Sequence, residues 1–169
     1  MDHSTAELYH ELRKMAQRLL RSDGGRRTLD PTDVVHEVFV RLSRGEPLDG
    51  LARASFLSLA ATAMRHVLVD EAKRRRALKR GRDFEAVALS SVHLRVDEPE
   101  LDVLDLDAAL AKLKQLDERQ ARIVELRFFA GLSGEQVAAL LGLTRRTVTN
   151  EWAMARAWLK RELGRGQRE

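Results

Sequence analysis

The amino-acid sequence predicts an all-α protein with two small helical domains joined by a linker. Its 169 residues include 44% hydrophobic but only 5% aromatic residues and three prolines, which favours helices around an aliphatic core. Apolar residues recur at helical spacing in stretches bounded by capping residues, glycine or proline. We place a three-helix bundle at residues 1–80, the linker at 81–100, and a four-helix unit ending in a helix-turn-helix at 101–165.

The charges fall into three blocks along the chain. Residues 1–82 carry 17 Lys/Arg against 11 Asp/Glu, residues 83–118 carry 3 against 10, and residues 119–169 carry 10 against 5. Two basic blocks around an acidic middle indicate two polyanion-binding units joined by a segment that does not bind. The alternative is that surface charge merely fluctuates along the chain.

Composition and motifs argue against several other classes of protein. The chain has no cysteine, so it contains neither a disulfide nor a thiolate metal site. No apolar run reaches the roughly 20 residues that cross a bilayer, and no signal peptide is visible, so we expect a cytoplasmic protein. His36-Glu37 resembles the start of a zinc-protease HExxH motif, but Val40 replaces the second histidine. We predict no metal, no cofactor and no catalytic site.

Two helices are predicted before residue 45. The first covers residues 4–21, with Ser4 and Glu7 as a capping box and a leucine-rich stripe. The second begins at Asp30-Pro31, a capping residue followed by a proline in the first turn. Its outer side carries charged residues at helical spacing, which is typical of a solvated face: Asp33, Glu37, Arg41 and Arg44.

A long third helix is predicted from about Ala52 to Arg80, because this stretch contains neither proline nor glycine. Phe56, Ala60 and Met64 belong to its apolar side. Its last turns contain the sequence KRRRALKR, with six positive charges. Such a run is either a solvated tail or a segment that follows phosphates, where neutralised phosphates release counterions.

The second half of the chain returns to helix at about residues 101–114, and Asp117 then caps another helix with a capping box to Gln120. The helix-turn-helix follows. Ser133 and Gln136 form a third capping box, and Gly142 ends the helix in a left-handed turn.

Thr144 caps the last helix, in which Val148, Trp152, Ala155 and Leu159 form a buried stripe. The start of such a helix enters the major groove of DNA, where Arg reads guanine and Asn reads adenine. The alternative is an ordinary helical hairpin with a basic face. The candidate DNA-reading residues are Arg145, Arg146, Thr147, Thr149, Asn150 and Arg156.

Taken together, the two halves resemble the bacterial extracytoplasmic-function (ECF) sigma factors of RNA polymerase, whose two helical domains are called regions 2 and 4. The resemblance runs from about Leu8 to Leu163. It is carried by DPTDVVHEVFVRL at 30–42, FLSLAATAMRHVLVDEAKRRRA at 56–77, and LDERQARIVELRFFAGLSGEQVAALLGLTRRTVTNEWAMARAWLKREL at 116–163.

The resemblance implies a promoter-specificity subunit that binds core RNA polymerase and promoter DNA. The second helix would dock on the β′ clamp helices through Asp33, His36, Glu37 and Arg41, and the second domain would contact the β flap. The long helix would open and hold the −10 element through Arg65, His66, Lys73, Arg74, Arg75 and Arg76. The helix-turn-helix would read the −35 element, and an anti-sigma factor is a possible further partner.

The chain departs from the usual family pattern at four positions. His36 replaces a common glutamine, and His66 replaces a common asparagine. Thr149 and Glu151 stand where Lys or Arg is common. Because Glu151 near phosphates would be repelled, we expect it to face cytosine or solvent. Two rivals remain on the residues: a helix-turn-helix repressor or activator with a sensing bundle, and an enzyme with a DNA-binding appendage. The repressor leaves KRRR unexplained, and the enzyme lacks a pocket of converging polar residues.

Overall fold

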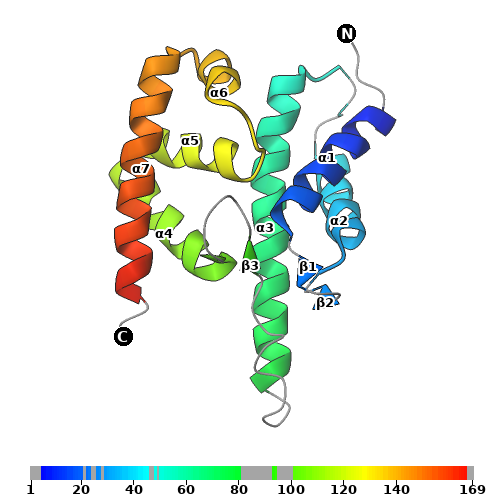
Figure 1. Ribbon diagram of the computed structural model, residues 1–169. Coiled ribbons are helices and arrows are strands. Elements are labelled where there is room, and N and C mark those ends of the chain that lie inside the picture. The colour runs from blue at the N-terminus through cyan, green and yellow to red at the C-terminus, as the bar shows by residue number, and fades with distance from the viewer. Residues whose placement is uncertain are drawn as a thin grey trace.

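A computed structural model describes residues 5–20, 22–23, 26–27, 29–45, 48, 50–80, 93–94 and 101–166. Within these residues the fold is all-α, as predicted (Figure 1). Two antiparallel two-residue ladders interrupt the helices: β1 (Ser22–Asp23) with β2 (Arg26–Arg27), and β3 (His93–Leu94) with β4 (Leu101–Asp102). The helices are α1 (Thr5–Leu19), α2 (Pro31–Ser43), α3 (Arg53–Arg80), α4 (Val103–Leu116), α5 (Glu118–Phe128), α6 (Gly134–Leu141) and α7 (Arg145–Gly166).

Capping residues begin these helices close to where the sequence predicts. Asp30 accepts a hydrogen bond from the Thr32 amide at 2.7 Å, with Pro31 in the first turn of α2. Asp117 caps α5 with the predicted hydrogen bond from the Gln120 amide to its side chain, at 3.0 Å, but the return bond of the predicted capping box does not form. The backbone N–H of Asp117 instead donates to Leu113 O at 2.7 Å. Because α5 follows α4 directly, this amide is already satisfied by the end of α4. Ser4, which the sequence predicts to form a capping box with Glu7, lies outside the described residues.

The helices α1, α2 and α3 pack together and form what we call the N-terminal group. The leucine-rich stripe of α1 is buried, as is the inner side of α2 with Val34, Val35 and Val38. Phe39 is half-buried and meets Tyr9 edge to face, with ring centroids 6.1 Å apart. The mixed-charge side of α2 therefore stays on the outside of the group.

The remaining helices, α4 to α7, form the C-terminal group, in which α7 packs against all three others. Its core contains Leu106, Leu110, Ile123 and Phe129, which are almost completely buried. In Figure 1 this group occupies one side of α3, while α1 and α2 occupy the other.

Helix α3 is the central element of the fold, because both groups pack against it (Figure 1). Phe56, Ala60 and Met64 are fully buried, as the apolar pattern predicts. The helix also buries Val69 and Ala72, so it has a second inner side. Consequently the buried apolar residues of both groups form one continuous cluster.

Candidate functional site

The helix-turn-helix has the local geometry that its residues predict. Both hydrogen bonds of the capping box are present, from Ser133 N–H to Gln136 Oε1 at 2.8 Å and from Gln136 N–H to Ser133 Oγ at 3.2 Å. Gly142 has φ +65°, a left-handed conformation that glycine adopts without steric cost. Thr144 Oγ1 accepts from the Thr147 amide at 3.1 Å and begins α7.

The first turns of α7 present the predicted DNA-reading residues on the surface. Arg145, Arg146, Thr149, Asn150 and Arg156 are exposed, and Thr147 is half-buried at the cap. Arg145 forms an ion pair of 2.9 Å with Glu135 in α6, but both side chains remain about 70% exposed or more. An exposed pair of this kind is weak and does not prevent the arginine from turning to a new partner.

The prediction for Glu151 is wrong, because this side chain faces neither DNA nor solvent. It is 6% exposed and accepts two hydrogen bonds from Arg119 of α5. The bond to Glu151 raises the pKa of Arg119, which therefore stays charged. The negative charge of Glu151 in α7 is thus neutralised within the protein.

Trp152 does not complete the buried stripe of α7 as predicted, whereas Val148, Ala155 and Leu159 are buried. It is half-buried, with the guanidinium carbons of Arg127 and Arg156 at 5.1 Å and 5.8 Å from its ring centroid. Since cations are attracted to the face of an indole ring, Trp152 helps to hold Arg156 along the surface of α7.

The basic end of α3 differs from the start of α7, because several of its arginines are hydrogen-bonded to acidic residues. Arg74 and Arg75 both donate to Glu71, with distances of 2.7 Å to 2.8 Å. The bond from Arg74 is the main cause that lowers the pKa of the Glu71 carboxyl. Arg76 reaches Asp102 just before α4, at 3.2 Å. The exposed members of the predicted −10 set are His66, Lys73, Arg74 and Arg76.

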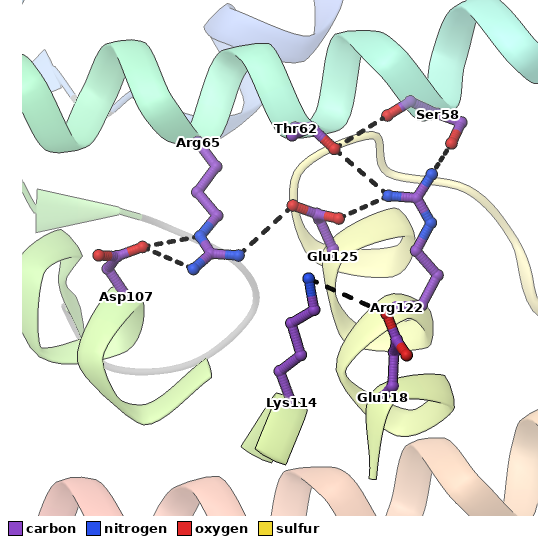
Figure 2. A network of polar contacts seen from close by, with 8 residues as sticks. All are labelled: Ser58, Thr62, Arg65, Asp107, Lys114, Glu118, Arg122 and Glu125. Carbon is purple, nitrogen blue, oxygen red and sulfur yellow. Dashed lines mark hydrogen bonds and ion pairs between the residues drawn. The ribbon is translucent and has the colours of Figure 1, made fainter. Parts of the chain in front are cut away.

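Arg65, the first residue of that set, lies between the two helix groups (Figure 2). Its Nε donates to Asp107 Oδ1 of α4 at 2.7 Å, and its Nη1 lies 3.5 Å from Glu125 Oε1 of α5. The Arg65 side chain is only 18% exposed. In this arrangement Arg65 faces the C-terminal group.

The outer side of α2 carries the residues predicted to dock on polymerase. Asp33, His36 and Glu37 are exposed. Arg41 donates to Glu37 at 3.3 Å and to Asp70 of α3 at 2.9 Å, and the bond to Asp70 is the main cause that raises its pKa. Arg41 thus ties α2 to α3 beside an accessible acidic patch.

Four charged residues at the contact between the groups were not identified from the sequence: Arg18, Asp107, Arg122 and Glu125. The sequence contains one signal that could have identified them. Glu125 follows Ile123 and Val124 on the apolar side of α5, where an unpaired carboxylate would be costly, and it is only 7% exposed. A buried charge requires a partner, and Arg122 one turn earlier supplies it at 2.7 Å.

Two further features bear on function. Among the described residues, no group of His, Cys, Asp or Glu could hold a metal ion. Within that same part of the chain, no helix is long and apolar enough to cross a membrane.

An all-helical chain that exposes arginines at the start of the second helix of a helix-turn-helix is typical of helical DNA-binding proteins. The comparison with protein families narrows this class. The family profile described as ECF sigma factor matches residues 2–165, so the chain belongs to the ECF sigma factors. It matches no curated protein and no solved structure. Members of this family act in transcription initiation with core RNA polymerase and promoter DNA.

Proposed function

We propose that this chain directs RNA polymerase to its promoters by reading the −35 element with α7 and the opened −10 strand with α3. The observation that carries the proposal is the placement of Arg145, Arg146 and Asn150. They are exposed in the first turns of a helix whose start is set by Gly142 and Thr144. That is the part of a helix-turn-helix that enters the major groove.

The −10 function rests on α3. Lys73, Arg74 and Arg76 are exposed on its last turns, where they can follow the phosphates of a separated strand. Arg65 and His66 lie two turns earlier on the same helix, and Arg75 lies among the basic residues. Strand opening draws on the binding energy of the captured strand, without nucleotide hydrolysis and without a cofactor.

Polymerase docking rests on α2. Asp33, His36 and Glu37 form an exposed patch, next to Arg41, that is available to dock on the β′ clamp helices. The C-terminal group contacts the β flap. The corresponding domains are residues 1–80 and 101–165 with the linker at 81–100, and an anti-sigma factor is a candidate regulatory partner in the cytoplasm.

Run-off transcription with core RNA polymerase on a library of genomic fragments tests this function directly. We expect transcripts from a small set of promoters only when the chain is added. Charge reversal with Asp33→Arg and Glu37→Arg is expected to abolish co-purification with core polymerase. The control Glu7→Lys reverses an exposed charge on α1 and is expected to leave co-purification unchanged. If no fragment yields a chain-dependent transcript, the proposed function is wrong.

A further inference from the structure

A buried acidic residue lies in the second turn of α7, next to the residues that the proposed function assigns to base reading. Glu151 directly follows Asn150, and its side chain is 8% exposed. A carboxylate in such surroundings requires a charged partner. Arg119 of α5 supplies one, because its Nε donates to Glu151 Oε2 at 3.0 Å and its Nη2 donates to Glu151 Oε1. A bidentate ion pair therefore joins α5 to α7.

The two partners of this ion pair differ in their exposure to solvent. The Arg119 side chain is 56% exposed, so the guanidinium is the outer member of the pair and the carboxylate is the inner one. A guanidinium has five N–H groups, and the two bonds to Glu151 leave the two on Nη1 and one on Nη2 for another acceptor. An anion that approaches this side of α7 from solvent therefore meets Arg119 before it meets Glu151.

The opposite flank of α7 carries cations of its own. Trp152 follows Glu151 by one residue, which is about 100° around the helix, and the buried stripe of α7 lies between these two positions. The guanidinium carbons of Arg127 and Arg156 lie 5.1 Å and 5.8 Å from the centroid of the Trp152 ring. Helix α7 thus has Arg119 on one flank and this pair of arginines on the other.

Helix α5 can supply a cation to each flank because it runs across α7 and packs against it (Figure 1). Arg119 lies in the first turn of α5 and Arg127 in its last turn. Their Cα atoms are separated by about 12 Å along the helix axis, at ~1.5 Å per residue. An α-helix with its side chains is about 10–12 Å in diameter, so the two arginines reach α7 from opposite sides.

This arrangement corresponds to the surroundings of a helix in the major groove. The groove is about 12 Å wide, so a helix that enters it has a phosphate backbone along each flank. The proposed function places Arg146 and Asn150, both exposed, between these flanks and toward the bases. A cation on a flank then lies beside phosphates, and hydrogen bonds from arginine to phosphate are among the stronger ones in proteins.

We propose that Arg119 is a phosphate-binding residue of the DNA interface, contributed by α5 from outside the helix-turn-helix, and that Glu151 is the residue that positions its guanidinium. The inference rests on the proposed function, which places α7 in the groove, and adds a contact to it. Because phosphates are the same at every sequence, Arg119 contributes affinity and register without base preference. An acidic residue in α7 thus supports DNA binding through the arginine that it holds.

The test measures how the DNA affinity of the full chain depends on salt. Fluorescence anisotropy between about 50 and 200 mM KCl uses two duplexes of about 20 base pairs, one with a −35 element found by run-off transcription and one of unrelated sequence. Each phosphate contact contributes about 0.9 to the slope of log affinity against log salt. Arg119→Gln is expected to reduce this slope by about 0.9 on both duplexes, so its affinity falls about 3.5-fold less than that of the parent over this range.

The matched control is Lys160→Gln, which removes one exposed positive charge near the other end of α7. It is expected to keep the slope of the parent chain on both duplexes. Asn150→Ala, in contrast, is expected to weaken binding to the −35 duplex alone, because it removes a base contact. An equal effect of Asn150→Ala on both duplexes would count against the proposed base reading, and the slope for Arg119→Gln would still be measured.

A double variant separates phosphate binding from a role in folding alone. Arg119→Gln leaves the buried carboxylate of Glu151 without a cation, so circular dichroism and urea unfolding accompany each measurement. Arg119→Gln combined with Glu151→Gln keeps the net charge of the chain and leaves a neutral, hydrogen-bonding pair at the same place. It is expected to keep the reduced slope. If Arg119 only neutralised Glu151, this double variant would bind DNA as the parent does.

The positioning role of Glu151 is tested by removing its side chain. Glu151→Ala removes a negative charge and would tighten DNA binding if charge alone mattered. Because it also releases Arg119, it is expected to bind both duplexes about threefold more weakly than the parent, which corresponds to the cost of ordering one long side chain. Glu151→Gln keeps an oxygen that accepts from Arg119 and is expected to restore the affinity of the parent.

Three outcomes would overturn the proposal. An unchanged slope for Arg119→Gln, or a slope equal to that of the parent for the double variant, would exclude the phosphate contact. Binding by Glu151→Ala that is equal to or tighter than that of the parent would exclude the positioning role. These outcomes are distinct from a failure of the proposed function, which the run-off assay detects, because the duplex of unrelated sequence gives the slopes without a promoter.

Discussion

The two cationic surfaces of this sigma factor differ in how their arginines are held. At the start of α7, Arg146 and Asn150 are exposed and Arg145 has only an exposed partner on the neighbouring helix. On α3, Arg65 is paired with two carboxylates of the C-terminal group, and Arg76 is paired with Asp102 beside the same group. The start of α7 is therefore accessible in the folded chain, whereas part of the cationic surface of α3 is covered.

This difference follows from the surroundings of each helix. The side of α7 that we propose reads DNA faces away from the core, so its side chains keep their hydration and their freedom to move. Helix α3 is central and buried on two sides, so a charged residue on its second side must find a partner inside the protein. The difference predicts that a −35 duplex reaches the residues of α7 without any rearrangement of the protein, whereas Arg65 reaches DNA only when its ion pairs are broken.

The largest effect is expected from removing the Glu125 carboxylate, which lies between Arg65 and Arg122 at the contact of the two helix groups. Glu125→Ala leaves Arg122 without its 2.7 Å partner and leaves Arg65 with Asp107 alone. We expect a loss of about 3 kcal/mol in the free energy of unfolding, measured by urea denaturation.

The matched change at the other surface is Glu135→Ala, which removes the partner of Arg145 where both side chains are exposed. Its expected cost is below about 0.5 kcal/mol. Equal losses for Glu125→Ala and Glu135→Ala would contradict the distinction between a covered and an accessible surface.

Next in size is the effect of removing base contacts at the start of α7. Arg146→Ala and Asn150→Ala are each expected to weaken binding to a −35 duplex by about 1–3 kcal/mol, as for a lost base contact. An electrophoretic mobility-shift assay, on a −35 duplex from a promoter found by run-off transcription, measures this loss of affinity. Lys160→Ala removes an exposed charge near the other end of α7 and serves as the control. Unchanged promoter selectivity in both variants would refute this orientation of the helix.

A smaller effect is expected from a substitution at Gly131, which lies next to the Arg18 guanidinium. Gly131→Ala places a methyl group against the guanidinium at φ +69° and is expected to cost about 2 kcal/mol, from backbone strain and from displaced hydrogen bonds. Thermal unfolding measures the loss. Gly142→Ala has a similar φ with no neighbour within 4 Å, so it reports the strain alone, about 1 kcal/mol. If both variants lose the same stability, the Arg18 contact contributes nothing.

The smallest effect concerns Glu71, whose pKa is lowered chiefly by its hydrogen bond with Arg74. A carboxylate with a lowered folded pKa stabilises the protein at pH values above its unfolded pKa, and this stabilisation disappears as the pH falls through the folded value. Glu71→Gln is expected to be slightly less stable than the parent at pH 7, with a difference that vanishes in acid below the ordinary value of 4.5.

The same substitution frees Arg74 and Arg75 and is expected to tighten oligo-dT binding by about twofold at low salt. Urea unfolding between pH 3 and pH 7 and fluorescence anisotropy measure these effects. A stability difference that persists or grows in acid would show that Glu71 acts in some way other than as a carboxylate.

Local signals in the sequence predicted most of the helices and their caps. Capping at Asp30, Asp117 and Ser133 and the left-handed turn at Gly142 depend on neighbouring residues only, so they can be recognised without the fold. The predicted placement of exposed residues on α7 also follows from helical periodicity.

The misses have a common physical reason, since they involve contacts between residues far apart in the chain. Glu151 was expected at the surface, but Arg119, 32 positions earlier, holds it inside. Arg18 reaches carbonyls 110 and 111 positions away. Periodicity shows which side of a helix a residue lies on, but it does not show which other helix packs there.

The central claim is that the start of α7 is accessible in the free chain, whereas Arg65 of α3 is covered by the C-terminal group. The most direct measurement compares Arg146→Ala and Arg65→Ala in the free chain, by mobility shift on a −35 duplex for the first variant and by fluorescence anisotropy with oligo-dT for the second. The account predicts weaker duplex binding for Arg146→Ala and no loss of oligo-dT binding for Arg65→Ala. Weaker oligo-dT binding by Arg65→Ala than by the parent chain would contradict it.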